Sequence, residues 1–214
     1  MLTVHHLGKS QSERILWLCE ELGVTYEMKK HDRDAVTMLA PPELRALTAM
    51  GTAPVITDDS LVLGESGAIV EYILAKYGQG KLKPAVDDAN FSKYLHWFHF
   101  VNATLQPLMH RNMLLLRRAN LPRDNPVAAG TWERLERALG AVEKRLGETA
   151  FLAGDDLTAA DIMGVFTLST MRYFMPVDYA PYPNIRAYLH RIGARPAYQR
   201  AWGKGDADLA PLLT

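Results

Sequence analysis

Cysteine is almost absent from this chain, since Cys19 is the only one among 214 residues. A lone cysteine cannot form an internal disulfide, so the fold does not depend on an oxidising compartment. The Cys-x-x-Cys pattern of dithiol chemistry is excluded for the same reason. Cys19 shares a helical face with Ile15 and Leu22. We therefore expect a buried structural thiol, and the alternative is a nucleophile.

An excess of charge is also missing, because Lys+Arg and Asp+Glu both number 24. A formal charge of zero gives no reason to expect a nucleic-acid partner, which favours a basic stripe. No stretch approaches the roughly 18 apolar residues of a membrane span. Residues 1–6 lack the basic start and apolar run of a signal peptide. We expect a cytoplasmic protein with no membrane partner.

The histidines form no usual metal-binding pattern. His96 and His99 lie one helical turn apart, with His110 further on, and His5 and His6 are adjacent. None of these groups has a third ligand at the spacing of a common zinc site. We therefore expect no metal cofactor.

The first 78 residues alternate between strand and helix patterns. Short apolar runs predict strands at residues 2–6, 25–28, 54–57 and 61–63. Helical spacing and proline or glycine boundaries predict helices at 15–22, from 41 onward and at 69–77. The resulting order β-α-β-α-β-β-α predicts one mixed four-stranded sheet.

The strand pattern disappears after a connector rich in glycine and aspartate. We predict a first domain at 1–78, a linker at 79–90 and an all-helical domain at 91–214. Apolar residues at helical spacing predict two long antiparallel helices, the first kinked or ended by Pro107. Three shorter helices are expected near residues 158–172, 183–193 and 196–202.

Three segments of the first domain carry candidate chemistry, and the first is Gly51 to Ile56. Pro54 cannot donate a ladder hydrogen bond, so it lies at a strand edge or follows a cis peptide bond. If it is cis, the backbone of Ala53 could pair with an extended peptide in the manner of a β-strand. The alternative is a trans proline in an ordinary loop.

The second segment is Glu65-Ser66, directly before the helix near Ile69. Serine is a favoured N-cap, and the N–H groups at a helix start attract an anion. A ligand carboxylate fits there, and Glu65 could pair with a ligand ammonium. The alternative is a simple helix cap.

The third segment runs from Gly8 to Arg14, between the first strand and the first helix. It places the hydroxyls of Ser10 and Ser12 at a helix N-terminus. There the helix dipole and an O–H donor both favour the thiolate form of a nearby thiol. The alternative is capping, and at least one of the two serines is expected only to cap.

Together these segments make the sequence similar to the glutathione transferase family. The similarity covers essentially the whole chain and includes the Ser-x-x-x-Arg start at 10–14, the Ala-Pro-Val-Ile strand at 53–56 and the helical second half. The stretch at 14–23, Arg-Ile-Leu-Trp-Leu-Cys-Glu-Glu-Leu-Gly, most resembles bacterial and fungal members. The resemblance implies a thioredoxin-like α/β domain followed by an all-α domain that shapes the acceptor pocket.

The catalytic group implied by the resemblance is a serine hydroxyl. Ser10 would activate the sulfur of glutathione, the co-substrate, and Ser12 is the alternative. His99 and Asn102 lie on a helix that passes close to glutathione in relatives, so we name them as candidates for the acceptor pocket.

The resemblance also implies how glutathione is held. The backbone of Ala53, before Pro54, would bind the cysteinyl unit. Glu65 and Ser66 would bind the γ-glutamyl end. Thr52 stands where many members carry a lysine near the glycyl carboxylate, so one charge contact is missing here.

The predicted activity is attack of the glutathione thiolate on a small, apolar electrophile, a detoxification reaction. The alternatives are glutathione-dependent reduction of peroxides or disulfides, and a non-catalytic glutathione-binding protein on the same fold. The resemblance also implies a homodimer, with contacts from the helices near Ile69 and Tyr94.

One further motif predicts structure and not chemistry. Thr158 and Asp161 have the spacing of a capping box, and Leu157 and Ile162 stand at hydrophobic-staple positions. We therefore exclude Asp161 from the candidate site.

Overall fold

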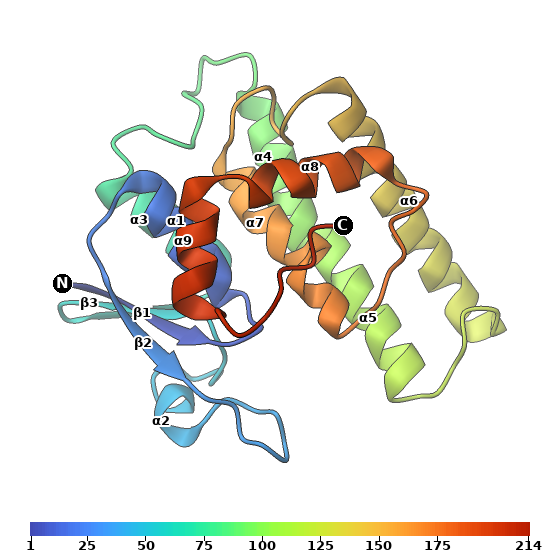
Figure 1. The fold of residues 1–214 in the computed structure, drawn as a ribbon, viewed down its shortest axis with the longest axis horizontal. Helices are drawn as coiled ribbons and strands as arrows, with labels where there is room; N and C mark the ends of the chain where they lie inside the picture. Colours follow the sequence, from blue (N-terminus) through green and yellow to red (C-terminus); the bar gives the residue numbers. More distant parts are fainter. The chain divides into compact units, whose positions relative to one another are not determined.

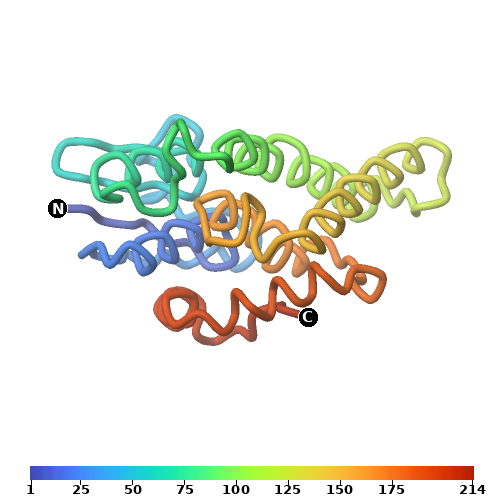
Figure 2. The backbone as a smooth tube through the Cα atoms, turned by 90° about the horizontal axis from the view of Figure 1, so that it is seen from above, coloured from blue at the N-terminus to red at the C-terminus, as the bar shows by residue number.

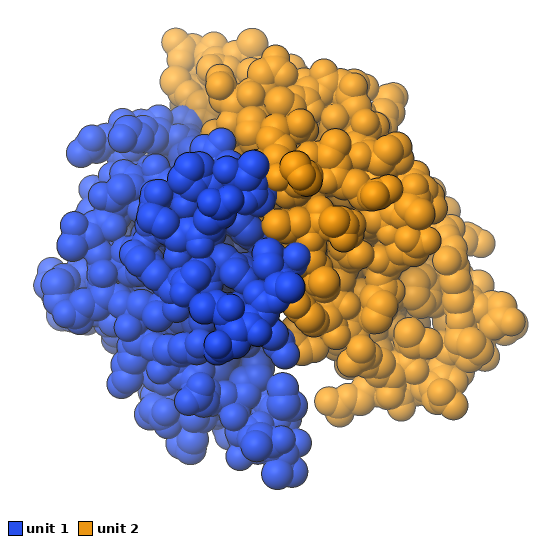
Figure 3. All heavy atoms as spheres, in the orientation of Figure 1, with its two compact units in different colours: residues 1–83, 192–211 blue, residues 84–191, 212–214 orange.

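The computed structural model describes residues 1–214 and divides into two compact units (Figure 3). Unit 1 contains residues 1–83 and 192–211, and unit 2 contains residues 84–191 and 212–214. The chain passes between the units within the predicted linker 79–90. The last helix, which we placed in the helical domain, groups by its contacts with the sheet-containing unit 1.

Unit 1 is built on one mixed four-stranded sheet in the order β2-β1-β3-β4 (Figure 1). The strands are β1 (Leu2–Leu7), β2 (Glu27–His31), β3 (Val55–Asp58) and β4 (Leu61–Gly64). Strand β1 runs parallel to β2 and antiparallel to β3, and β4 closes a hairpin with β3. The predicted order of elements and the thioredoxin-like α/β fold are confirmed.

Strand β2 begins two residues later than the sequence indicated. Its pairing with β1 starts at Glu27, opposite Thr3. Tyr26, which we placed in the strand, instead donates its hydroxyl to Glu20 of the preceding helix at 2.8 Å. The partner strand and this side-chain bond, both set by the tertiary structure, therefore determine where β2 starts.

Helices cover both faces of the sheet in unit 1. Helices α1 (Ser12–Leu22) and α3 (Ser66–Tyr77) pack together on one face, and α9 (Pro196–Gly205) packs against α1. The short α2 (Pro42–Arg45) inserts Leu44 into an apolar cluster with Leu7 of β1 and Val55 of β3. Figure 1 shows α9 beside α1, although the two are far apart in sequence.

Unit 2 is all-helical. Its elements are α4 (Phe91–Phe100), a π-helical stretch (Val101–Leu105), α5 (Gln106–Arg117), α6 (Pro126–Glu148), α7 (Ala159–Leu168), a 3₁₀ turn (Thr170–Tyr173) and α8 (Pro183–Gly193). Helices α5 and α6 form the predicted antiparallel pair and are joined by the loop around residue 120 (Figure 2). The segment α4–α5 continues for several turns past the proline at which we expected an end.

The proline at 107 is accommodated by a wide helical turn. The N–H of Gln106 donates to the C=O of Val101, five residues back, so the backbone is π-helical just before Pro107. Because proline lacks an N–H and crowds the preceding turn, a π-bulge relieves the conflict without ending the helix. The expectation that Pro107 ends the helix was therefore wrong, and α5 runs on to Arg117.

Candidate functional site

The three candidate segments of unit 1 meet at one end of the sheet. The register pairs His5 with Val55 and Val55 with Gly64. The end of β1, the start of β3 and the end of β4 are therefore neighbours. The loops that follow or precede them carry Ser10, Ala53 and Glu65, which the sequence alone could only place on separate segments.

The strand β3 begins directly after a cis peptide bond between Ala53 and Pro54. The sequence left the choice between cis and trans open, and the structure has the cis form. Ala53 is half-buried against the apolar cluster of Leu7 and Val55, whereas Thr52 is exposed. The backbone of Ala53 thus lies at the edge of the sheet beside an exposed hydroxyl.

The start of α3 differs from the expected cap. Ser66 is the first helical residue, and Glu65 occupies the N-cap position with φ +68° and ψ 112° and no side-chain cap. Positive φ in a glutamate costs about 1–3 kcal/mol, and such strain is concentrated at binding sites. Since no side chain caps this helix, its first N–H groups face an anion-binding position.

The hydroxyl of Ser66 is held by the first turn of α1. Arg14 Nη1 donates to Ser66 Oγ at 3.1 Å, and Ser66 Oγ donates to Gln11 Oε1 at 3.1 Å. Arg14 Nη1 also donates to Gln11 Oε1 at 2.5 Å. Arg14 is buried, which lowers the pKa of its guanidinium. This network fixes α3 against α1, and Gln11 is a member that the sequence analysis missed.

The two candidate hydroxyls of the Gly8–Arg14 segment touch each other. Ser10 Oγ and Ser12 Oγ lie 2.7 Å apart, and the backbone N–H of Ser12 donates to Ser10 Oγ at 3.2 Å. Ser12 has no exposed surface, and its hydroxyl also contacts His6 Nδ1 at 2.9 Å. Ser10 retains 7% exposure, so it is the outer member of the pair.

Two polar residues near the serines were not recognised from sequence. His6 looked like one of several unassigned histidines, and its only signal is its place in a strand just before Ser10 and Ser12. Asp206 follows α9 and lies within 3.3 Å of the His6 ring. Nothing local in the sequence indicates that pairing.

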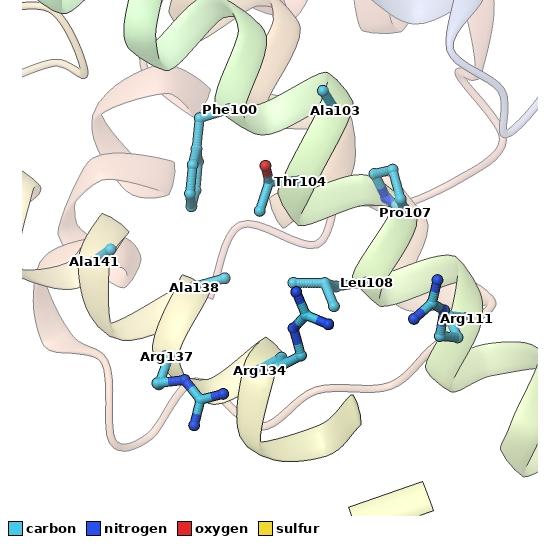
Figure 4. A pocket seen from close by; sticks show the side chains of 10 residues that line it. All are labelled: Phe100, Ala103, Thr104, Pro107, Leu108, Arg111, Arg134, Arg137, Ala138 and Ala141. Carbon is cyan, nitrogen blue, oxygen red and sulfur yellow. The ribbon is translucent and has the colours of Figure 1, made fainter. Parts of the chain in front are cut away.

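The candidate acceptor residues lie in unit 2. His99 is exposed on α4 and places its ring edge-on to Phe98, with centroids 5.4 Å apart. Asn102 is half-buried in the π-helical stretch. Neither lines the cavity of about 560 Å³ within unit 2. Figure 4 shows that cavity, where Phe100 and Leu108 face Ala138, with three arginines at its rim.

The residues that we placed outside the site are buried. Cys19 has no exposed surface, and burial raises the pKa of its thiol to about 12. Asp161 and Thr158 form the predicted capping box of α7. The expected structural burial of both residues is thus observed.

Comparison with known proteins agrees with the fold and the site. Family models described as the N-terminal and C-terminal domains of glutathione S-transferase match residues 10–76 and 125–191. Glutathione S-transferase 3 of Schizosaccharomyces pombe is 31% identical, over 100% of this chain and 92% of its own.

Solved structures show the same likeness. A glutathione S-transferase from Actinobacillus pleuropneumoniae is 34% identical with a TM-score of 0.87, over 100% of this chain and 99% of that one. A theta-class enzyme from Xanthomonas axonopodis pv. citri, solved with glutathione bound, is 27% identical with a TM-score of 0.73, over 94% and 96%.

A thioredoxin-like unit with a helical partner and a serine pair at the sheet end defines a thiol-handling transferase. The chain belongs to the glutathione S-transferase family and is a glutathione transferase enzyme. No helix in it is long and apolar enough to cross a membrane.

Proposed function

We propose that the enzyme binds glutathione at the sheet end of unit 1 and that Ser10 donates its O–H to the glutathione sulfur. The observation that carries this proposal is the position of Ser10 as the outer member of a buried hydroxyl pair. At pH 7 a thiol with a pKa of about 8.5 is only a few per cent ionised. A hydrogen bond to the thiolate favours ionisation, and each unit of pKa lowering corresponds to about 1.4 kcal/mol.

The rest of the tripeptide follows the same end of the sheet. The backbone of Ala53 before Pro54 pairs with the cysteinyl unit, and the uncapped start of α3 at Ser66 receives the γ-glutamyl carboxylate. Glu65 accepts the γ-glutamyl ammonium, and Thr52 lies toward the glycyl end. The relative solved with glutathione bound supports this assignment, because it is similar over nearly the whole chain.

The reaction that suits this site is nucleophilic attack by the thiolate on a small apolar electrophile, which is the chemistry of detoxification. His99 and Asn102 stay candidates for the acceptor side. We also propose a homodimer in the cytoplasm, with α3 and α4 contributing the contact, and the family membership supports this assembly. Light scattering on the purified enzyme tests it, and a monomeric mass would contradict it.

The role of Ser10 is tested with Ser10→Ala and a matched control, Ser60→Ala, in the exposed turn between β3 and β4. Removing a hydrogen bond to a charged group costs about 1.5–3 kcal/mol, so kcat/KM for Ser10→Ala falls by about 10- to 150-fold. Glutathione binding, measured by calorimetry, persists. Wild-type turnover in Ser10→Ala would reject this role and transfer it to Ser12 or to backbone donors.

The acceptor class is tested on the wild-type enzyme with three probes: 1-chloro-2,4-dinitrobenzene, cumene hydroperoxide and a mixed disulfide of glutathione. We expect the aromatic halide to be turned over fastest. Turnover of only the hydroperoxide or the disulfide would assign a reductase. Binding of glutathione without turnover of any probe would assign a non-catalytic role.

A further inference from the structure

Four buried polar side chains form a continuous chain from the end of α9 to Ser10. Asp206 Oδ2 lies 3.3 Å from His6 Nε2, and His6 Nδ1 lies 2.9 Å from Ser12 Oγ. Ser12 Oγ in turn lies 2.7 Å from Ser10 Oγ. Each of the four residues is at least nine-tenths buried. All four belong to unit 1, so the chain of contacts is internal to one compact body.

Two glycines make this close approach sterically feasible. A Cβ on Gly205 would lie 2.9 Å from His6 Nε2, and a Cβ on Gly8 would lie 2.9 Å from Asp206 Oδ1. Real Cβ atoms do not come so near, so any side chain at either position would push the pair apart. The N–H of Lys9 also donates to Asp206 Oδ1 at 3.3 Å. The carboxylate is thus held between the Gly8 loop and the imidazole.

Counting donors shows that the chain has two consistent arrangements. A serine hydroxyl has one hydrogen and two lone pairs. Ser12 Oγ already accepts the N–H of Leu7 at 3.1 Å. Its second lone pair and its one hydrogen therefore have to be shared between His6 Nδ1 and Ser10 Oγ.

In the first arrangement His6 carries a proton on both ring nitrogens. Nε2–H faces the Asp206 carboxylate, and Nδ1–H donates to Ser12 Oγ. Ser12 then donates its hydrogen to Ser10 Oγ, which also accepts the backbone N–H of Ser12. Both lone pairs of Ser10 are filled, so its own hydrogen points away from Ser12 and is available to a ligand sulfur.

In the second arrangement His6 carries one proton, on Nε2 toward Asp206. Nδ1 is then an acceptor, and the hydrogen of Ser12 goes to it. The 2.7 Å contact between the serines is a hydrogen bond only if Ser10 now donates to Ser12. The Ser10 hydrogen is turned inward and is lost to the sulfur. A neutral ring protonated on Nδ1 instead would set the Nε2 lone pair against the carboxylate, which is unfavourable.

The geometry points to Asp206 and His6 as positioning residues that direct the Ser10 hydroxyl through Ser12. This inference rests on the proposed function, because it assigns what controls the hydroxyl that meets the sulfur. The thiol donor is favoured when His6 is doubly protonated and is withdrawn when His6 is neutral. Activity therefore depends on a proton that sits two residues away from the sulfur.

The charges around His6 set which arrangement prevails. Asp206 and, from α1, Glu13 are the acids near its ring, and Glu13 shares a small cavity with it, lined also by Tyr198 of α9. Lys30 of β2 pairs in register with His6. Arg33 donates to the C=O of Gly8 at 3.0 Å and so lies near the Asp206 carboxylate. Among these groups Asp206 is the one that reaches a ring nitrogen.

The test is the pH dependence of kcat with glutathione and 1-chloro-2,4-dinitrobenzene over about pH 6 to 9. The wild-type rate rises as the thiol ionises and declines as His6 loses its proton. In Asp206→Asn the decline moves to lower pH, and turnover at the alkaline end falls about ten-fold. Asp206→Glu, which restores a carboxylate, moves the decline back toward wild type. Asp208→Asn, an exposed neighbour, keeps the wild-type profile.

A uniform loss at every pH in Asp206→Asn, with no shift of the decline, would overturn the inference, because a merely structural role predicts that result. A double variant gives the second readout. In a Ser10→Ala background Asp206→Asn has no further effect if it acts through Ser10. An equal further loss in that background would also overturn the inference. Wild-type activity in Ser10→Ala alone would instead remove the proposed function, so the two failures are distinguishable.

If Asp206→Asn does not fold, the wild-type protein still decides. Nitrogen-15 NMR of the His6 ring in the glutathione-bound enzyme reports how many protons it carries. Two protons at the pH of maximal turnover support the inference. One proton at that pH contradicts it.

Discussion

Arg14 Nη1 donates a hydrogen bond to Ser66 Oγ at 3.1 Å, and this bond joins the first turn of α1 to the first turn of α3. The same nitrogen bonds Gln11, so one buried guanidinium fixes two elements of the candidate glutathione site. A planar fork of donors makes this geometry specific to arginine.

Arg14→Lys is therefore expected to weaken glutathione binding more than it slows turnover. The ammonium cannot reach Gln11 and Ser66 in the same plane, so α3 loses its tie to α1. We expect KM for glutathione to rise about ten-fold while kcat changes less. Steady-state kinetics at saturating electrophile measures this. Arg137→Lys, on the exposed face of α6, is the control, and equal effects in both variants would contradict the role of Arg14.

Cys19 is expected to be inert in the folded enzyme. It is fully buried, and burial raises the pKa of its thiol to about 12, so almost no thiolate forms near neutral pH. A thiol reagent such as dithiobisnitrobenzoate should label the native protein slowly and the urea-unfolded protein with one equivalent. Cys19→Ala should keep glutathione-dependent turnover. Fast labelling without denaturant would show that the helix α1 opens or that the thiol is a nucleophile.

Asp58 makes stability depend on pH. Burial alone would raise the pKa of this carboxyl, but hydrogen bonds from Lys76 at 2.6 Å, Tyr77 at 2.5 Å and Tyr72 at 2.8 Å outweigh burial and hold the pKa below its ordinary range. Because the folded pKa is the lower one, the stabilisation is complete above the unfolded value of about 3.9 and is lost as the pH falls below it.

Urea unfolding from about pH 7 down to pH 3 measures this contribution. Asp58→Asn should lower the free energy of unfolding by about 1–3 kcal/mol at neutral pH and flatten its decline in acid. The exposed neighbour Asp59 provides the control, because its pair with the Met1 amine is a surface interaction. An identical acid dependence in Asp58→Asn and the wild type would contradict the assignment.

Asp161 is expected to be a structural residue of unit 2. Burial raises its pKa, and it accepts hydrogen bonds from the backbone N–H of Leu152 and Thr158, each at 2.9 Å, and from Tyr188 at 3.0 Å. Asp161→Ala leaves these donors unpaired, which we expect to cost about 3 kcal/mol. The melting temperature should fall by about 6–12 °C. A lost turnover without any loss of melting temperature would place Asp161 in the chemistry instead.

Local patterns predicted the elements of unit 1 and the capping box of α7, because short-range propensity and turn chemistry decide them. The Ser-x-Ser segment and the proline at 54 marked the sheet end for similar reasons, since special backbone positions leave a sequence signal. The resemblance in the first helix then supplied the family, which the matched domains support.

Long-range partners were not predictable from local patterns. The return of α9 to unit 1 and the pairing of Asp206 with His6 join residues 200 positions apart. The hydroxyl of Ser66 looked like an N-cap, but the competing donor Arg14 pulled it into a tertiary bond. Pro107 looked like a helix end, but a π-helical turn absorbed its missing N–H. In each case a tertiary contact outweighed the local preference.

The most direct measurement of the central claim is the titration of enzyme-bound glutathione by its thiolate absorbance near 240 nm. In the wild type we expect the bound thiol to ionise about one to two pH units below free glutathione. In Ser10→Ala that lowering should largely disappear while glutathione stays bound. An unchanged titration midpoint in Ser10→Ala would contradict the claim that the Ser10 hydroxyl stabilises the thiolate.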